Sequence, residues 1–254
     1  GMKELRRARS ETGPSHLACL RRVLSRVWRL GFMMRFLLFQ RHRHNRVVLE
    51  TVAGRPILVL PTVMNPVLFM TGQFLAETVA ADPAGFGKPA GSRRDASVLD
   101  LGTGTGVAAV FAARWASQVV AVDINPAAVR CTRINALLHG VEHKVEALHG
   151  DLFEPVAGRR FDVILFNPPY LPGQPRTTFE QALRSEGLAE RFAAGLAGHL
   201  SGDGYALLLL SSIGDEAGWL EPLRRHGFAC QPVTQRNLVS EMVTIYRVDP
   251  VQPA

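Results

Sequence analysis

The stretch Val98-Leu99-Asp100-Leu101-Gly102-Thr103-Gly104-Thr105-Gly106 is an apolar strand that runs into a loop with glycine at every second position. A helical pattern follows it directly, over residues 107–115. Glycines allow a tight turn and let the backbone approach a ligand closely, while the first turn of a helix offers free N–H groups. The stretch predicts a ligand-binding turn, although an ordinary strand-to-helix turn would read similarly and a dinucleotide loop would read Gly-x-Gly-x-x-Gly.

Strands and helices alternate from this loop onward. We expect strands at residues 97–101, 118–123, 144–149, 161–166 and 206–210, and helices at 107–115, 126–138, 179–200 and 216–225. Two closing strands, at 228–235 and 241–248, have only a short link between them, which favours an antiparallel pair at the sheet edge. The pattern predicts an α/β, Rossmann-like fold with a seven-stranded, mostly parallel sheet covered on both faces.

The chain ahead of residue 72 divides into two parts. Residues 1–46 carry eleven arginines and one lysine against two glutamates, so they hold a charge of +10, whereas the rest of the chain sums to −3. Apolar residues recur at helical spacing over 17–40. We expect a basic, amphipathic helical extension at 1–46 that suits an anionic partner, a β-hairpin and linker at 47–71, and the main domain at 72–250.

Composition argues against several classes of protein. The cysteines, Cys19, Cys131 and Cys230, are odd in number and widely spaced, which suits neither a disulfide framework nor a zinc site. The apolar stretches are too short to cross a bilayer. We expect a cytoplasmic protein with no metal and no transmembrane segment, and the sequence leaves its oligomeric state open.

Two carboxylates stand at the ends of later strands. Asp123 ends a strand 21 residues after Gly102, where it can accept hydrogen bonds from both hydroxyls of a ribose. A helix cap ahead of Pro126 is the alternative role for Asp123, and the two roles are compatible. Asp151 follows the next strand, within His149-Gly150-Asp151-Leu152.

The strand at 161–166 ends in Asn167-Pro168-Pro169-Tyr170. Each proline lacks an N–H and keeps the residue before it extended, so this loop presents acceptors and few donors. The Asn167 side-chain oxygen and the Pro168 carbonyl can each accept one proton of an NH2 group, and Tyr170 can stack on a flat target. The element predicts a site for a planar nitrogen, with a plain turn as the alternative.

These motifs resemble known enzymes. The glycine spacing with Asp100 resembles the class I methyltransferases, and residues 47–248 resemble the HemK family of glutamine-amide methyltransferases that act on translation release factors. The second resemblance rests on the hairpin, the glycine loop, Asn-Pro-Pro-Tyr, the segment 184–188 and the segment 236–241. Residues 61–69 depart from the family because they lack an acidic pair.

The resemblance implies S-adenosyl-L-methionine as cofactor and assigns residues to it. Catalysis is expected from Asn167, Pro168, Pro169 and Tyr170. Cofactor binding is expected from Thr71, Asp100, Gly102, Thr103, Gly104, Gly106, Asp123, Ile124, Asp151, Leu152 and Asn167. The expected substrate is a glutamine side-chain amide of a protein such as a release factor. An exocyclic amine of an RNA or DNA base is the alternative, because Asn-Pro-Pro-aromatic elements serve those enzymes too, and a cofactor-binding module without turnover is a third reading.

Overall fold

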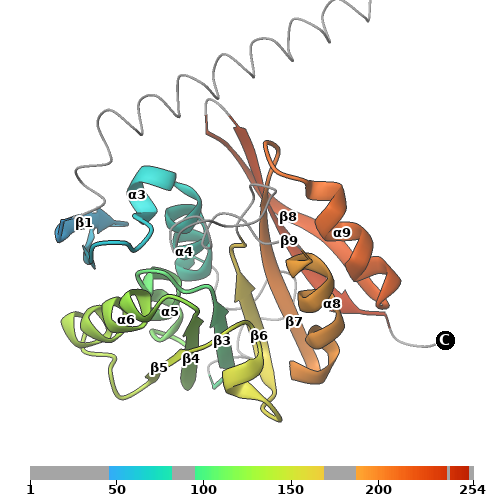
Figure 1. Cartoon of the computed structure of the whole chain (residues 1–254), viewed down its shortest axis with the longest axis horizontal. Coiled ribbons are helices and arrows are strands. Elements are labelled where there is room, and N and C mark those ends of the chain that lie inside the picture. The colour runs from blue at the N-terminus through green and yellow to red at the C-terminus, as the bar shows by residue number, and fades with distance from the viewer. Residues whose placement is uncertain (1–45, 82–94, 169–186, 239–240, 252–254) are drawn as a thin grey trace, which may run out of the picture. The chain divides into compact units, whose positions relative to one another are not determined.

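The computed structural model describes residues 46–81, 95–168, 187–238 and 241–251. The expectations for residues 1–45, and those for Pro169 and Tyr170, therefore lie outside the described residues. The elements are labelled in Figure 1. Their bounds are β1 (Val48–Val52), β2 (Arg55–Val59), α3 (Pro66–Phe69), α4 (Thr71–Ala81), β3 (Ser97–Leu101), α5 (Val107–Ala112), β4 (Gln118–Asp123), α6 (Pro126–Leu138), β5 (Val145–His149), η2 (Glu154–Val156), β6 (Phe161–Phe166), α8 (Leu188–His199), β7 (Leu200–Ser211), α9 (Glu216–Arg225), β8 (Phe228–Leu238) and β9 (Glu241–Pro250).

Seven strands form one sheet in the order β5-β4-β3-β6-β7-β9-β8. The first five run parallel to one another, and β9 runs antiparallel to both β7 and β8. The predicted fold class is confirmed, including the antiparallel pair of closing strands. The strand order changes direction at β3, because β4 and β5 follow on one side of it and β6 and β7 on the other. In open α/β sheets, ligands bind at such a switch point, outside the carboxyl ends of the strands.

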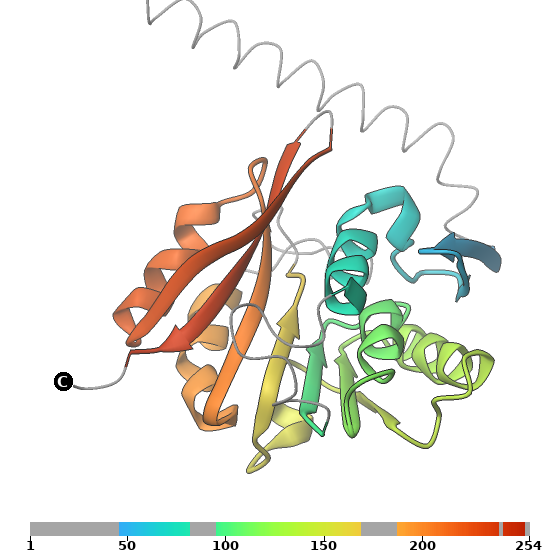
Figure 2. The same cartoon turned by 180° about the vertical axis from the view of Figure 1, so that it is seen from behind.

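The alternation of side chains along the central strands builds two cores. Leu99 and Leu101 of β3 pack with residues of α8 and α9, whereas Val98 packs with residues of α4 and α5 on the other side. Successive side chains of a strand point to opposite faces, so a continuous apolar run such as 97–101 needs helices on both. Figures 1 and 2 show these helices on the two faces of the sheet.

The hairpin of β1 and β2 is joined to the main domain by Asn135 of α6. The Asn135 side chain is fully buried and exchanges two hydrogen bonds of 2.8 Å with the backbone of Leu58 in β2. Its amide nitrogen also donates to the Thr105 carbonyl over 2.8 Å. One side chain therefore connects the hairpin, α6 and the glycine loop, which satisfies polar groups that would be costly to bury alone.

Several elements differ from the sequence prediction, and the clearest differences concern α8, β7 and α3. The helix expected at 179–200 begins at Leu188, because Gly187 has φ +70° and caps it, and residues 179–186 lie outside the described part. Strand β7 begins at Leu200 instead of 206. Its pairing with β6 shifts in register between Phe161, which lies opposite Leu200, and Val163, which lies opposite Tyr205, so that residues 201–204 are included in the strand. The short helix α3 was not predicted. Asn65 caps it by accepting from the N–H groups of Val67 and Leu68 over 2.9 and 3.1 Å.

No helix among the described residues combines the length and the apolar character that crossing a membrane requires.

Candidate active site

A cavity of about 260 Å³ lies at the carboxyl ends of β3, β4, β5 and β6. This volume is close to the lower end of the range for small-molecule sites, about 300 to 1,000 Å³. The predicted site residues that line it are Thr71, Gly102, Thr103, Gly104, Asp123, Ile124, Asp151, Leu152, Asn167 and Pro168. The structure therefore brings together in one cavity residues that span almost a hundred positions of the chain.

The glycine loop has the backbone that its sequence suggested. Gly102, Gly104 and Gly106 have φ of +61°, +57° and +79°, in the left-handed region that other residues seldom adopt. Gly102 and Gly104 line the cavity. Gly106 lies behind its wall, where a Cβ would stand 2.7 Å from the Thr132 side chain of α6. Gly106 therefore allows close packing of the loop against a helix.

Asp100 also lies behind the cavity wall and acts on the loop. It is 2% exposed, and one carboxyl oxygen accepts a hydrogen bond of 2.6 Å from the Thr103 hydroxyl. Burial raises the pKa of Asp100 to about 7, although the bond from Thr103 opposes this shift. Thr103 lines the cavity, so Asp100 shapes the site through its neighbour.

Asp123 stands at the end of β4 with each carboxyl oxygen bonded once to the backbone. One oxygen accepts from the Gly104 N–H and the other from the Asn125 N–H, both over 2.8 Å. Burial raises the pKa of Asp123, and these two N–H groups oppose the shift. The cap of α6 is Asn125, which accepts from the Ala127 N–H, so the helix-cap role falls to Asn125 instead of Asp123. Each oxygen of Asp123 keeps a lone pair for a further donor.

Asp151 and Leu152 form the turn after β5. Leu152 has φ +47°, an uncommon conformation for a residue with a branched side chain. One Asp151 oxygen lies 2.5 Å from a guanidinium nitrogen of Arg191, which reaches it from α8. Arg191 also lines the cavity. Arg191 was not predicted from the sequence, because forty residues separate it from its partner and nothing local marks it.

Asn167 follows β6 directly and meets the first residue of α4. Its side-chain nitrogen donates to the Thr71 hydroxyl over 3.2 Å, and Thr71 is 1% exposed. Its Oδ1 is buried, and no hydrogen-bond partner reaches it from the part of the chain that the structure describes. A buried acceptor without a donor is costly, which suggests that a ligand supplies the donor.

The residue before Asn167 gives it a rigid base. The ring of Phe166 lies 4.9 Å from that of Phe192 in α8 and 5.6 Å from that of Trp219 in α9, measured between centroids. Aromatic pairs at these distances stabilise beyond the area that they bury. The end of β6 is therefore fixed by the core on the face of α8 and α9.

The linker between β2 and α4 supplies a wall that sequence analysis did not assign to the site. Thr62 and Asn65 both line the cavity, and the Asn125 side chain donates to the Thr62 carbonyl over 3.0 Å. Asn65 and Asn125 each precede a proline at the start of a helix. An Asn-Pro pair is a recognisable signal for a helix start, so this feature was within reach of the sequence.

Comparisons with known proteins agree with this geometry. The family model described as the methyltransferase small domain matches residues 73–208. A Methanocaldococcus jannaschii protein named as a protein N5-glutamine methyltransferase is 35% identical over 144 residues, which cover 53% of this chain and 72% of the relative. The release factor glutamine methyltransferase of Geobacter sulfurreducens is 44% identical over 79 residues, and the match spans only 27% of that protein and 30% of this chain.

Solved structures share the fold. The ribosomal protein L11 methylase of Lactobacillus delbrueckii subsp. bulgaricus superposes with a TM-score of 0.54 and 19% identity, over 76% of this chain and 84% of the other. The T. thermophilus 16S rRNA N2 G1207 methyltransferase, solved with AdoMet and guanosine, superposes with a TM-score of 0.57 and 23% identity, over 81% and 50%. With the family match over more than half of its residues, this chain belongs to the methyltransferase small domain family, and it is an S-adenosylmethionine-dependent methyltransferase.

Proposed function

We propose that this chain methylates the side-chain amide nitrogen of a glutamine in a protein of the translation machinery. The observation that carries the proposal is the buried Oδ1 of Asn167, which has no donor among the described residues although Asn167 lines the cavity. A planar NH2 group offers such a donor.

The cavity residues suit S-adenosylmethionine. The lone pairs that remain on Asp123 can accept from two ribose hydroxyls, in addition to its two backbone bonds. The left-handed glycines at 102 and 104 leave the loop without side chains where the cofactor would pass. Ile124, Asp151 and Leu152 would hold the base, with apolar contacts from the two aliphatic side chains and an acceptor from Asp151. These features support the proposed use of the cofactor.

The chemistry depends on holding a weak nucleophile in place. When bound, the cofactor supplies an electrophilic methyl group on its sulfonium. The amide nitrogen attacks poorly because its lone pair is conjugated with the carbonyl. Asn167 Oδ1 and the Pro168 carbonyl would each accept one N–H, which orients the nitrogen and favours positive charge developing on it. As the N–C bond would form, the S–C bond of the sulfonium would break, and one N–H proton would pass to solvent, so the product keeps one N–H.

Thr71 prepares Asn167 for this task. A side-chain amide can turn its oxygen or its nitrogen toward a ligand, and the two ends have opposite hydrogen-bonding roles. Because the Asn167 nitrogen donates to Thr71, the oxygen is the end left for the substrate. We assign Thr71 to the orientation of Asn167, next to the role at the cofactor that the family resemblance implies.

The names of the relatives guide the choice of substrate. The Methanocaldococcus relative is named for N5-glutamine methylation, and the Geobacter relative for release factors. Both names specify glutamine, and the second also specifies a translation protein, which supports the proposed glutamine amide and work in the cytoplasm. We also propose that the chain consists of three parts, at residues 1–46, 47–71 and 72–250. The basic residues 1–46 would be an extension that binds an anionic partner.

The test is to incubate the purified chain with S-adenosylmethionine labelled in its methyl group and a cell extract. Treatment of the product with protease or with nuclease then shows which macromolecule carries the label. We expect protease to release the label and nuclease to leave it in place. Label that only nuclease releases would overturn the proposal and favour an exocyclic base amine, which the same two acceptors can hold.

A further inference from the structure

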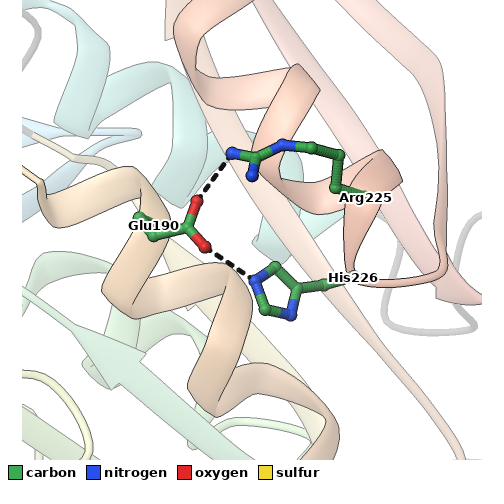
Figure 3. A network of polar contacts seen from close by, with 3 residues as sticks. All are labelled: Glu190, Arg225 and His226. Atoms are coloured by element: carbon green, nitrogen blue, oxygen red, sulfur yellow. Dashed lines mark hydrogen bonds and ion pairs between the residues drawn. The ribbon is translucent and has the colours of Figure 1, made fainter.

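The first turn of α8 presents two charged residues in succession, and each is bound on a different side. Arg191 pairs with Asp151 at the cavity, over 2.5 Å. Glu190 accepts from Arg225 and from His226 at the end of α9, both over 2.8 Å (Figure 3). This turn is therefore fixed between α9 and the loop that follows β5.

The loop that carries Asp151 has a backbone that orients it. Leu152 adopts φ +47° although it is not glycine, and such conformations persist where the surroundings require them. Both Asp151 and Leu152 line the cavity, as do Leu188 and Arg191 of α8. The two segments thus form one corner of the cavity, at the carboxyl end of β5.

We propose that Arg191 is a positioning residue that makes this corner specific for a 6-aminopurine. It holds one oxygen of Asp151, so that the other oxygen stays turned toward the base and accepts from its amino group. The inference rests on the proposed function, because it requires the adenosine part of the cofactor in this cavity.

Asp151 alone does not fix the orientation of its own carboxylate, and Arg191 is placed to do so. The Asp151 side chain is 32% exposed, so without a partner its carboxylate would rotate and meet water. A guanidinium binds a carboxylate in a defined direction and therefore fixes this rotation. A fixed carboxylate accepts from a 6-amino group and repels the lone pairs of a 6-oxo group. The discrimination between adenine and hypoxanthine would thus depend on Arg191 through Asp151.

The experiment measures binding by calorimetry and needs no methyl acceptor. The full chain is titrated with S-adenosylhomocysteine and with S-inosylhomocysteine, which carries a 6-oxo group instead of the 6-amino group. For the wild-type chain we expect a preference for the adenine compound of about 10-fold or more, as for the loss of a hydrogen bond to a charged group. Thermal unfolding of every variant checks that it folds.

Arg191→Met keeps the length of the side chain without its charge, and it is the decisive variant. We expect its preference for the adenine compound to fall to about 2-fold or less, with partial recovery in Arg191→Lys. Adding Arg191→Met to Asp151→Ala should change nothing further, because Arg191 acts through Asp151. Glu190→Gln is the matched control, since it removes a neighbouring ion pair whose partners lie on α9, and it should keep the wild-type preference.

The outcomes separate this inference from the proposed function. An unchanged preference in Arg191→Met, or equal weakening for both compounds, would make the pair with Asp151 an ordinary surface ion pair and overturn the inference alone. Failure of the wild-type chain to bind S-adenosylhomocysteine would overturn the inference together with the proposed cofactor site. Equal effects of Glu190→Gln and Arg191→Met on the preference would also overturn the inference, because the position of α8 would then explain the preference without a specific role for Arg191.

Discussion

The Thr71 hydroxyl accepts a hydrogen bond of 3.2 Å from the side-chain nitrogen of Asn167, which joins the first residue of α4 to the first residue after β6. The bond decides which end of the Asn167 amide remains for a ligand. Thr71 can therefore influence the proposed reaction by orienting Asn167, whose oxygen would hold the substrate nitrogen.

Thr71→Val should lower kcat by about 5- to 20-fold, the range that corresponds to one to two kilocalories from a lost hydrogen bond. Valine keeps the shape of threonine but cannot accept from Asn167, so the amide is free to turn. Steady-state kinetics would show the loss in kcat, and this loss should exceed any loss of affinity for S-adenosylhomocysteine, because the expected role of Thr71 at the cofactor comes in addition to its role at Asn167. Thr71→Ser should restore most of the activity. A valine variant with wild-type kcat would refute the orienting role.

Asp123→Asn should weaken the binding of S-adenosylhomocysteine by about 10- to 100-fold, as expected for hydrogen bonds to a charged acceptor. Asparagine has nearly the same shape, but it brings a donor to a place where the Gly104 and Asn125 N–H groups already donate. Calorimetric titration measures the change. An affinity equal to that of the wild-type chain would remove Asp123 from the proposed ribose site.

Asp100 should make folding depend on pH. Its pKa is about 7 in the folded chain against a reference value of 3.8, so the folded state binds its proton more tightly. The protonated Asp100 therefore contributes fully to the free energy of unfolding below about pH 4. This contribution is lost as the pH rises toward 7, and above that pH the free energy of unfolding no longer changes through Asp100.

Asp100→Asn is neutral at every pH and can still accept from Thr103. The stability of this variant relative to wild type should therefore rise between pH 4 and 7, by a few kcal/mol in total according to about 1.4 kcal/mol for each pKa unit. Urea unfolding at four or five pH values gives the curve. A difference that does not vary with pH would show that the Asp100 carboxyl is not perturbed as described.

Gly106→Ala should destabilise the chain by about 2 to 4 kcal/mol, because alanine would be strained at φ +79° and its Cβ would stand 2.7 Å from Thr132. Gly140→Ala is a matched control, since Gly140 has φ +66° and no atom within 4 Å of the added Cβ. Its loss of about 1 to 2 kcal/mol isolates the conformational cost. Equal destabilisation of the two variants would show that the contact with Thr132 relaxes without cost.

Much of the fold follows from local sequence periodicity. Apolar runs such as 97–101 and 161–166 match strands buried on both faces, and the amphipathic pattern of 216–225 matches α9 residue for residue. The placement of Asp123 and Asn167 in one cavity also follows, because the carboxyl ends of parallel strands meet at one edge of the sheet.

The glycine loop motif does not show on which face of β3 the Asp100 side chain lies. Asp100 alternates with Leu99 and Leu101, so it shares the face of Val98, which packs against α4 and α5. Its carboxyl is therefore enclosed by the core and reaches the cavity through Thr103. The same alternation could have been read from the sequence.

Arg191 could not be found in this way. Its pairing with Asp151 depends on how α8 is rotated and where it begins, and both follow from the packing of Phe192 and Leu196 against the sheet. The start of α8 was also predicted too early. Gly187 precedes the first turn with a left-handed backbone, which a glycine permits but does not require, so the sequence alone does not locate this start. Contacts between distant elements are set by tertiary packing and leave little local signal.

If Asn167 presents its oxygen to the NH2 group of a glutamine, its removal should abolish methyl transfer, and a comparison of matched chains measures this. Wild type and Asn167→Ala are each incubated with S-adenosylmethionine and the protein substrate found by labelling, and tandem mass spectrometry locates the added methyl group. We expect N5-methylglutamine from wild type and, for Asn167→Ala, a loss of at least about 100-fold in kcat while the variant still binds S-adenosylhomocysteine. Unchanged turnover in Asn167→Ala, or a methyl group on any atom other than the glutamine amide nitrogen, would contradict the account.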